Sequence, residues 1–387
     1  MVDYELRLEN VQNALKSIAE RLEFARGEEE ISECILGGVA GLCNESCFET
    51  CSRMSEVFRK FQRHEGILYA LPYYRDHFTH AFHVFSLGYV TLSQWFTELA
   101  FLQAGDLGRR YWLLKEWFIA SVLHDIAYPI EMAESWVPQF PPDVLGVDIE
   151  LRSTFDWSPA LSGGQNMRHL DGLAAKFVSQ LPNDLDDTER ARRGVAFKQW
   201  FVGQLLERHD HGALAGISLP SLGWALTDED CAYGAALDIV LHNYHWRPHP
   251  TLRQLALSSY PLSALLAYCD TAQEWGRPRA SGVAGRRAMP EGTLKFYSVL
   301  VERAATTVTL SYDIEALCKN NNRNWGALRD REKRDRIDEQ RQSVFTDLEQ
   351  QTSGIPKAWA TGTANHSLRI RACDVNGENI GVLPFLV

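Results

Sequence analysis

The chain has 387 residues and a formal net charge of −11, with 45 % hydrophobic and 23 % charged residues. That length suffices for one large domain with additions or for two to three small ones, and the composition is that of a globular protein with a sizeable core. An acidic chain lacks the basic surface that neutralises duplex phosphates, so duplex nucleic acid is not expected as a partner. An acidic chain can still bind a small anionic ligand where a metal ion or local arginines supply positive charge.

The first 60 residues are predicted to be helical, with amphipathic segments at 11–25 and 51–64. The N-terminal segment carries charges throughout, which is not typical of a signal peptide. The longest uncharged stretch, 81–97, contains His, Ser, Thr and Gln and is a poor candidate for a membrane span. We therefore expect a cytoplasmic protein with reduced thiols and no membrane partner.

Three of the eight cysteines, Cys43, Cys47 and Cys51, recur every four residues and share one face of a predicted helix. Together with His64 they could form a zinc site. Their spacing matches no structural zinc pattern, so we expect buried thiols, with a metal or redox role as the alternative.

A helical core is expected at 61–285. Apolar residues recur there at spacings of three and four, which is typical of helices that pack together. The segments with this pattern are 111–136, 197–217, 230–246 and 261–276, and a connection rich in Pro and Gly, 139–165, follows the first.

The character of the chain changes after a Gly, Pro and Arg loop at 276–292. Strands are predicted within 307–314, 366–375 and 376–387, and a charged helix at 325–350. The expected fold class is therefore mainly α, with an N-terminal helical segment at 1–60, the helical core at 61–285 and a small α+β extension at 293–387.

Histidine and aspartate recur inside the apolar helices of the core. The segment "YYRDHFTHAFHVFSLGYV", 73–90, contains His77, His80 and His83. His124 and Asp125 are adjacent and follow seven uncharged residues. An ionised Asp after such a run costs free energy unless it is paired or bound to a metal. Imidazole with carboxylate is a good ligand set for a divalent transition metal.

Residues of the same kind lie on other predicted helices: Asp270 in "LLAYCD", His242 in "LDIVLH", and His211 just before a glycine. His209 competes with His211, but a glycine next to a ligand lets the backbone approach the site, which favours His211. Inward-facing side chains on several helices are how a metal site is built inside a helical bundle.

The ordered set His, His-Asp, His, His, Asp resembles the HD-domain superfamily of metal-dependent phosphohydrolases, and the resemblance covers residues 70–280. "HAFHV", with His80, is similar to the first ligand helix of that family, and "HDIAYP" is similar to the motif that names it. The resemblance implies an HD-domain helical bundle with a binuclear metal centre. One ion would be held by His80, His124, Asp125 and Asp270. The second would be held by His211 and His242, with Asp125 as the bridge.

The same resemblance implies a phosphohydrolase in which metal-activated water attacks phosphorus, with Asp125 as a catalytic residue. The two divalent ions would be Mn, Fe, Co, Ni or Zn, and less readily Mg, because the ligands are rich in histidine. The substrate would be a small anionic nucleotide: a dNTP, a cyclic nucleotide or oligonucleotide signal cleaved by a phosphodiesterase, or an alarmone. A mixed-valence di-iron oxygenase has the same order of ligands and is one alternative. The other is a nucleotide-sensing module. A homo-oligomer is compatible with each.

Two neighbours of the proposed ligands are candidates for the chemistry. His77, three residues before His80, is a candidate catalytic proton donor, whereas His83 is expected to be structural. Tyr128 stands where many family members have Lys or His, and a phenol there could only donate a hydrogen bond to substrate.

Candidates for substrate binding follow the last ligand. Gln273, Glu274 and Arg277 share the helix face of Asp270, and Arg279 lies in the basic loop that comes next. These residues could line a pocket and bind phosphate. The alternatives are a solvated helix end and a mobile loop.

Overall fold

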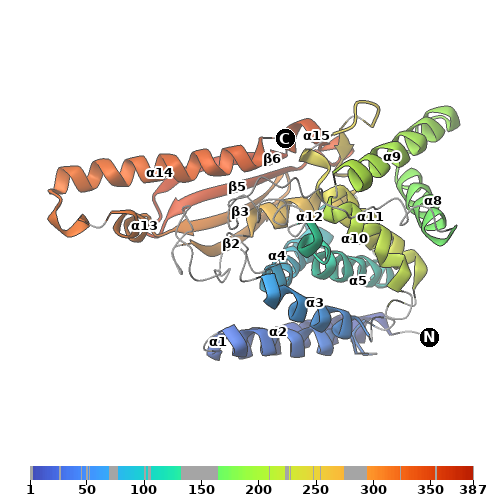
Figure 1. Cartoon of the computed structure of the whole chain (residues 1–387), viewed down its shortest axis with the longest axis horizontal. Coiled ribbons are helices and arrows are strands. Elements are labelled where there is room, and N and C mark those ends of the chain that lie inside the picture. Colours follow the sequence, from blue (N-terminus) through green and yellow to red (C-terminus); the bar gives the residue numbers. More distant parts are fainter. Residues whose placement is uncertain are drawn as a thin grey trace, which may run out of the picture.

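The structure is a computed structural model, shown as a ribbon in Figure 1. It describes residues 3–386 except for 26–27, 45, 49–50, 52, 69–76, 100–101, 103–105, 132–163, 209, 223–225, 227, 247, 253, 274–293, 323 and 354. The predicted fold class, mainly α with a small α+β extension, is confirmed. None of the described helices combines the length and the apolar character of a membrane span.

The N-terminal layer consists of α1 (Tyr4–Phe24), α2 (Glu28–Leu42) and α3 (Met54–Leu68), along the lower edge of Figure 1. Helix α1 begins where the Asp3 carboxylate accepts a hydrogen bond from the Leu6 amide at 3.0 Å. Arg7 donates to the Tyr111 hydroxyl at 3.0 Å, and this hydroxyl donates to the Cys47 carbonyl at 2.9 Å. Tyr111 therefore ties the layer to the core.

The helical core is made of α4 (His77–Glu98), α5 (Leu107–Leu123), α8 (Gly164–Ser179), α9 (Asp187–Glu207), α10 (His211–Ser218), α11 (Glu229–His242) and α12 (Pro261–Ala272). Short 3-10 turns, Leu219–Leu222 and Tyr244–Trp246, follow α10 and α11. The segments predicted from apolar spacing fall on α5, α9, α10, α11 and α12, but 111–136 runs past the end of α5 at Leu123, and 197–217 is divided between α9 and α10.

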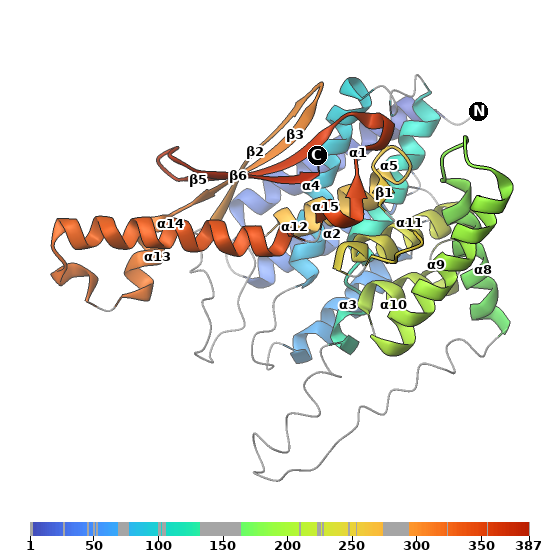
Figure 2. The same ribbon diagram turned by 90° about the horizontal axis from the view of Figure 1, so that it is seen from above.

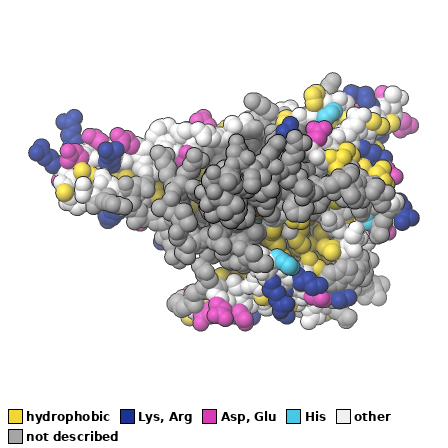
Figure 3. Space-filling model, in the orientation of Figure 1, with side chains coloured by type: hydrophobic (Ala, Val, Ile, Leu, Met, Phe, Trp, Pro, Cys, Tyr) yellow, Lys and Arg dark blue, Asp and Glu magenta, His cyan; other side chains and the backbone are white. Residues whose placement is uncertain are grey.

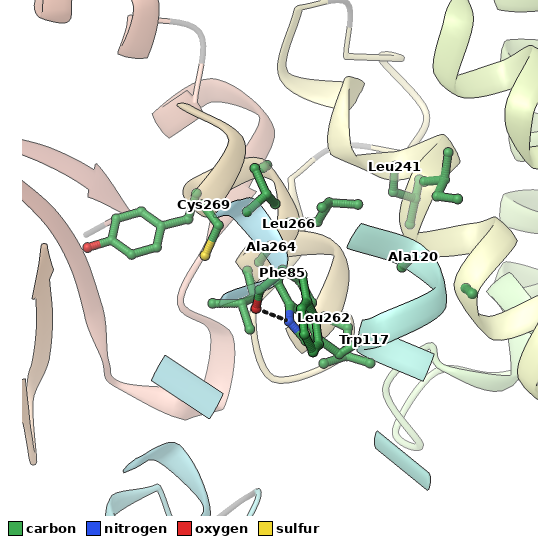
Figure 4. Close-up of a cluster of buried hydrophobic side chains, with 14 of the residues drawn as sticks. Phe85, Trp117, Ala120, Leu241, Leu262, Ala264, Leu266 and Cys269 are labelled. Carbon is green, nitrogen blue, oxygen red and sulfur yellow. Dashed lines mark hydrogen bonds between the residues drawn. The ribbon is translucent and has the colours of Figure 1, made fainter. Parts of the chain in front are cut away.

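Close packing of α4 and α5 depends on a glycine. A Cβ at Gly88 would lie 1.9 Å from the ring of Trp117, so only glycine allows this approach. The Trp117 indole is fully buried and donates a hydrogen bond to the Phe85 carbonyl at 3.0 Å. Figure 4 shows this bond among buried side chains of α4, α5, α11 and α12. The two helices are thereby held in a fixed register beside the candidate site.

The extension is a four-stranded sheet with helices. Its strands are β2 (Leu294–Glu302), β3 (Ala305–Tyr312), β5 (Ser367–Asp374) and β6 (Asn379–Leu386), in the order β2-β3-β5-β6. The central pair β3 and β5 is parallel, and both outer pairs are antiparallel. Between β3 and β5 the chain forms α13 (Ile314–Asn321), α14 (Asp330–Thr352) and α15 (Ile355–Ala358). The predicted boundary at 285–293 lies outside the described residues.

Figure 2 shows the sheet and α14 on one side of the core and α8 with α9 on the other. Helix α14 is charged, as predicted, and Figure 3 shows side chains of both signs at this end of the molecule. A short parallel pair of strands, β1 (Leu255–Ala256) and β4 (Trp359–Ala360), joins the core to the extension.

The sheet is bonded directly to two core helices. The Tyr268 hydroxyl on α12 accepts a hydrogen bond from the Val308 amide at 2.8 Å and donates to the Arg369 carbonyl at 2.6 Å. The Trp95 indole on α4 donates to the Thr306 hydroxyl at 2.7 Å. Helices α4 and α12 carry the first and last of the predicted metal ligands, so the extension holds both in place.

All eight cysteines are buried thiols, which confirms the prediction made for Cys43, Cys47 and Cys51. The helix face predicted for these three is wrong, because α2 ends at Leu42 and α3 begins at Met54. Burial and the neighbouring thiols raise the pKa of Cys43, which keeps it protonated. No group of three possible metal ligands found among the described residues includes a cysteine.

Candidate metal centre

The six predicted ligands come from helix positions that face one another. His80 lies in the first turn of α4, and Asp270 lies in the last turn of α12. Helix α5 ends at Leu123, so His124 caps it and Asp125 begins the turn that follows. Helix α10 begins at His211, behind Asp210, whose carboxylate accepts from the Ala213 amide at 2.8 Å; α11 ends at His242. Helix ends and the first turn of α4 thus bring all six residues together.

These residues form two groups that could each hold a metal ion. The first is His80, His124 and Asp270, and the second is Asp125, His211 and His242; within each group the ligand atoms lie within 4.8 Å of one another. In the first group Asp270 Oδ1 lies 2.7 Å from His80 Nε2 and 3.6 Å from His124 Nε2.

Asp125 belongs to the second group, and its carboxylate also faces the histidines of the first. Its Oδ2 is 3.3 Å from His124 Nε2 and 3.8 Å from His80 Nε2. Its Oδ1 is 3.4 Å from His211 Nε2. The side chain is 7 % exposed, so both oxygens are presented to buried histidines rather than to water. This is the position of a carboxylate that could contact two ions.

The four histidines share one orientation. Each donates its Nδ1 hydrogen to an oxygen: His80 to Gln273 Oε1, His124 to the Ser121 carbonyl at 2.7 Å, His211 to Glu131 Oε2 at 2.6 Å, and His242 to the Ile239 carbonyl. A bond at Nδ1 fixes the tautomer and leaves the Nε2 lone pair for a metal. All four Nε2 atoms would therefore be ligand atoms, and at His80 the metal would replace the proton that bonds Nε2 to Asp270 Oδ1, 2.7 Å away, in the metal-free protein.

Two buried nitrogens in the centre lack a hydrogen-bond partner among the described residues. They are Nε2 of His124 and Nε2 of His242, both on side chains without solvent exposure. A buried polar atom left unpaired costs about 1–3 kcal/mol. A metal ion satisfies such a lone pair, so the residues present fit a divalent metal.

Burial and charge together set the protonation of the centre. Burial opposes ionisation of Asp125, but the surrounding histidines hold the pKa of this carboxyl well below its usual range. Burial lowers the pKa of His211, and the bond to Glu131 with the Asp125 charge overcomes this and raises it to about 10. Burial and the charges of His124 and His211 lower the pKa of His242 to about 4. Without metal, His211 therefore carries a proton, and the charge of its ring faces Asp125 where a metal ion would otherwise lie.

Both neighbours singled out in the sequence lie beside the centre. His77 is buried, and its Nε2 is 4.0 Å from Asp125 Oδ2. Its ring stacks on Tyr128, with centroids 3.9 Å apart and planes at 25°. Tyr128 also packs edge-on against His211, at 5.4 Å between centroids. Their roles in catalysis and substrate binding stay predictions.

The structure gives Gln273 a second contact. Its side chain is fully buried, bonds His80 as described, and donates from Nε2 to Nδ1 of His83 at 3.1 Å. Helix α12 ends at Ala272, so Gln273 departs from the helical face on which it was placed. Substrate binding by Gln273 stays a prediction. The same holds for Glu274, Arg277 and Arg279. These three residues and His209 lie outside the described residues.

Two residues at the centre were not predicted. Glu131 accepts from both the ring and the backbone amide of His211, the latter at 3.1 Å. The Asn243 amide lies 3.1 Å from His211 Nε2. Asn243 caps α11 directly after a predicted ligand, His242, which was a weak signal for it. Glu131 carried no signal, because it is 80 residues from His211.

No family model, curated protein or solved structure matches this chain. The resemblance to HD-domain proteins rests on the order of the ligands along the chain and on the buried His and Asp groups that they form.

Proposed function

We propose that this protein is a metal-dependent HD-domain phosphohydrolase with a binuclear centre. The observation that carries the proposal is the position of Asp125, whose Oδ1 faces His211 and whose Oδ2 faces His124 and His80. A carboxylate shared in this way would suit a site that holds two divalent ions, the arrangement used in two-metal hydrolysis.

The charge of the centre supports an anionic substrate. Two divalent ions exceed the charge of the carboxylates of Asp125 and Asp270, so the loaded site would be positive inside an acidic protein. Four imidazoles among six ligands favour Mn, Fe, Co, Ni or Zn over Mg. When bound, two such ions supply Lewis-acid stabilisation of phosphoryl oxygens and lower the pKa of water towards neutrality.

The protein's own residues would orient the substrate and the metal centre and would protonate the leaving group. Asp125 would fix the positions of both halves of the centre. His77, stacked on Tyr128 and next to Asp125, would hold a proton at Nε2 and pass it to a leaving group. The Tyr128 phenol would donate a hydrogen bond to substrate. The substrate class we propose is a nucleoside phosphate: a dNTP, a cyclic nucleotide, an oligonucleotide signal or an alarmone.

The test measures where the new oxygen atom comes from. Metal-loaded protein is incubated with a panel of nucleoside phosphates under strict anaerobiosis with manganese, in water labelled with ¹⁸O. We expect turnover, with label in a phosphate-containing product. Asp125→Asn should abolish it, while Asp184→Asn, in an exposed turn, should leave it unchanged. A requirement for O₂ and iron, with label entering only from ¹⁸O₂, would overturn the proposal in favour of a di-iron oxygenase.

A further inference from the structure

A second cluster of acidic side chains, with Asp238 buried and Glu116 half-buried, lies apart from the metal centre, between α5, α11 and α12. It lines a cavity of about 190 Å³. Glu116 of α5 and Asp238 of α11 provide its acidic wall, with Ser258 and Ser259 from the turn before α12. Leu113, Pro261 and Leu262 provide apolar walls. None of these residues belongs to either group of metal ligands.

Asp238 presents an unsatisfied oxygen to this cavity. The residue is 2 % exposed, and its Oδ1 accepts a hydrogen bond from the Ser263 hydroxyl at 2.6 Å. Its Oδ2 is buried and accepts no hydrogen bond from an N–H or hydroxyl donor among the described residues, although the Asp238 and Glu116 carboxyls can bond each other by sharing a proton. A buried carboxylate oxygen without a donor is costly, so this atom calls for a ligand or a proton.

Glu116 lies close to the same face of α11. A Cβ added to Gly234 would lie 2.4 Å from the Glu116 carboxyl carbon, and Gly234 precedes Asp238 by about one helical turn. Burial raises the pKa of Glu116, and burial with the Glu116 charge raises the pKa of Asp238 well above its usual range. Two carboxyls in contact cannot both ionise in a buried site unless a cation neutralises them.

The nearby charges point to one monovalent cation. Lys176 on α8 attracts both carboxyls and offsets one negative charge, while Asp228 and Asp230 add repulsion at Glu116. Arg109 also lines the cavity, but its side chain is exposed, so water and salt screen its charge.

We propose that this cavity binds a primary alkylammonium ion, with the ammonium group between Glu116 and Asp238 and the alkyl chain along Leu113 and Leu262. The three N–H groups of the ammonium would donate to Asp238 Oδ2, to the Glu116 carboxylate and to a serine hydroxyl. The apolar walls would exclude water from the chain. Each polar and apolar part of the ligand thus meets a matching wall of the cavity.

The experiment uses the full chain in its metal-loaded form and n-butylammonium chloride as the probe. Controls at equal ionic strength are sodium chloride, tetramethylammonium, which has no N–H donor, and neutral n-butanol. We expect butylammonium alone to raise Tm saturably, by roughly 1–2 °C at ten times its Kd. Calorimetric titration should give the same Kd.

Two variants test the placement. Glu116→Gln and Asp238→Asn should each weaken butylammonium binding by about tenfold or more, because a charge-assisted bond is lost. Glu229→Gln, an exposed residue of α11 outside the cavity, should bind as the wild type does. Glu116→Gln keeps the shape of its side chain beside Gly234, so it remains informative if Asp238→Asn does not fold. No saturable binding, equal binding by Glu116→Gln, or an equal response to tetramethylammonium would overturn the proposal.

Discussion

Glu131 accepts a hydrogen bond from His211 Nδ1 at 2.6 Å and holds this ring with its Nε2 towards Asp125. Removing such a partner of a metal-bound histidine usually lowers metal affinity by about 10- to 100-fold. We therefore expect Glu131→Ala to weaken uptake of the second ion by that factor, as measured by competition with a chelator. Glu131→Gln keeps an acceptor and should lose less. Glu207→Ala, exposed on α9, is the control, and full uptake by Glu131→Ala would contradict the role of this bond.

The second prediction concerns the number of ions. Six ligands in two groups predict about two ions per chain by elemental analysis of protein purified without chelators. His211→Ala and His242→Ala should each approach one ion, with the helical signal in circular dichroism unchanged. His169→Ala, which pairs with Tyr233 on the far side of α11, should retain two. Two ions in both ligand variants would disprove the binuclear assignment.

Metal uptake at the second group should depend steeply on pH. In the metal-free protein the pKa of His211 is raised to about 10, and a metal must displace that proton. Because the neutral fraction falls about tenfold for each pH unit below the pKa, affinity should fall in the same proportion as pH decreases. We expect about 100-fold weaker binding at pH 6 than at pH 8, after correction for the competing chelator. An affinity that is constant over this range would show that His211 is neutral without metal.

The fourth prediction concerns the junction between core and extension. Tyr268→Phe removes the hydroxyl that bonds Val308 and Arg369 and leaves two backbone groups of the sheet without this partner. The expected cost is about 1–3 kcal/mol in the free energy of unfolding, measured by urea denaturation. Tyr4→Phe, on the N-terminal layer, should change stability little. An unchanged midpoint in Tyr268→Phe would show that the sheet docks mainly through apolar packing.

The ligands could be predicted because apolar helices tolerate few polar residues. His80, His124, Asp125, His242 and Asp270 stood out against Leu, Val, Ala and Phe, and the helix period placed them inward. The structure brings them together with His211 into the two groups. The strands within 307–314 and 366–375 were also predicted, since their β-branched and apolar residues are typical of strands.

What could not be predicted depends on tertiary contacts. Strand β2, Leu294–Glu302, was not predicted, and its register shifts between Phe296 and Ser298, where the alternation of a strand is broken. Glu131 is partly exposed and looks like any surface glutamate until the fold brings α10 against it. Gln273 was placed on the helix face of Asp270, but α12 ends at Ala272, so the bond of Gln273 to His80 could not be predicted from the helix period.

The bond between His80 and Asp270 also bears on how the protein folds, because it joins residues 190 positions apart in the chain. Closing so long a loop costs chain entropy that this single contact does not offset. We therefore expect the pair to form late in folding. Helices α4, α5 and α12 must already be packed when the two side chains meet. Folding would therefore bring the histidines together first, and metal would bind afterwards. Chelators added during refolding should leave the folding rate unchanged but lower the stability of the folded protein.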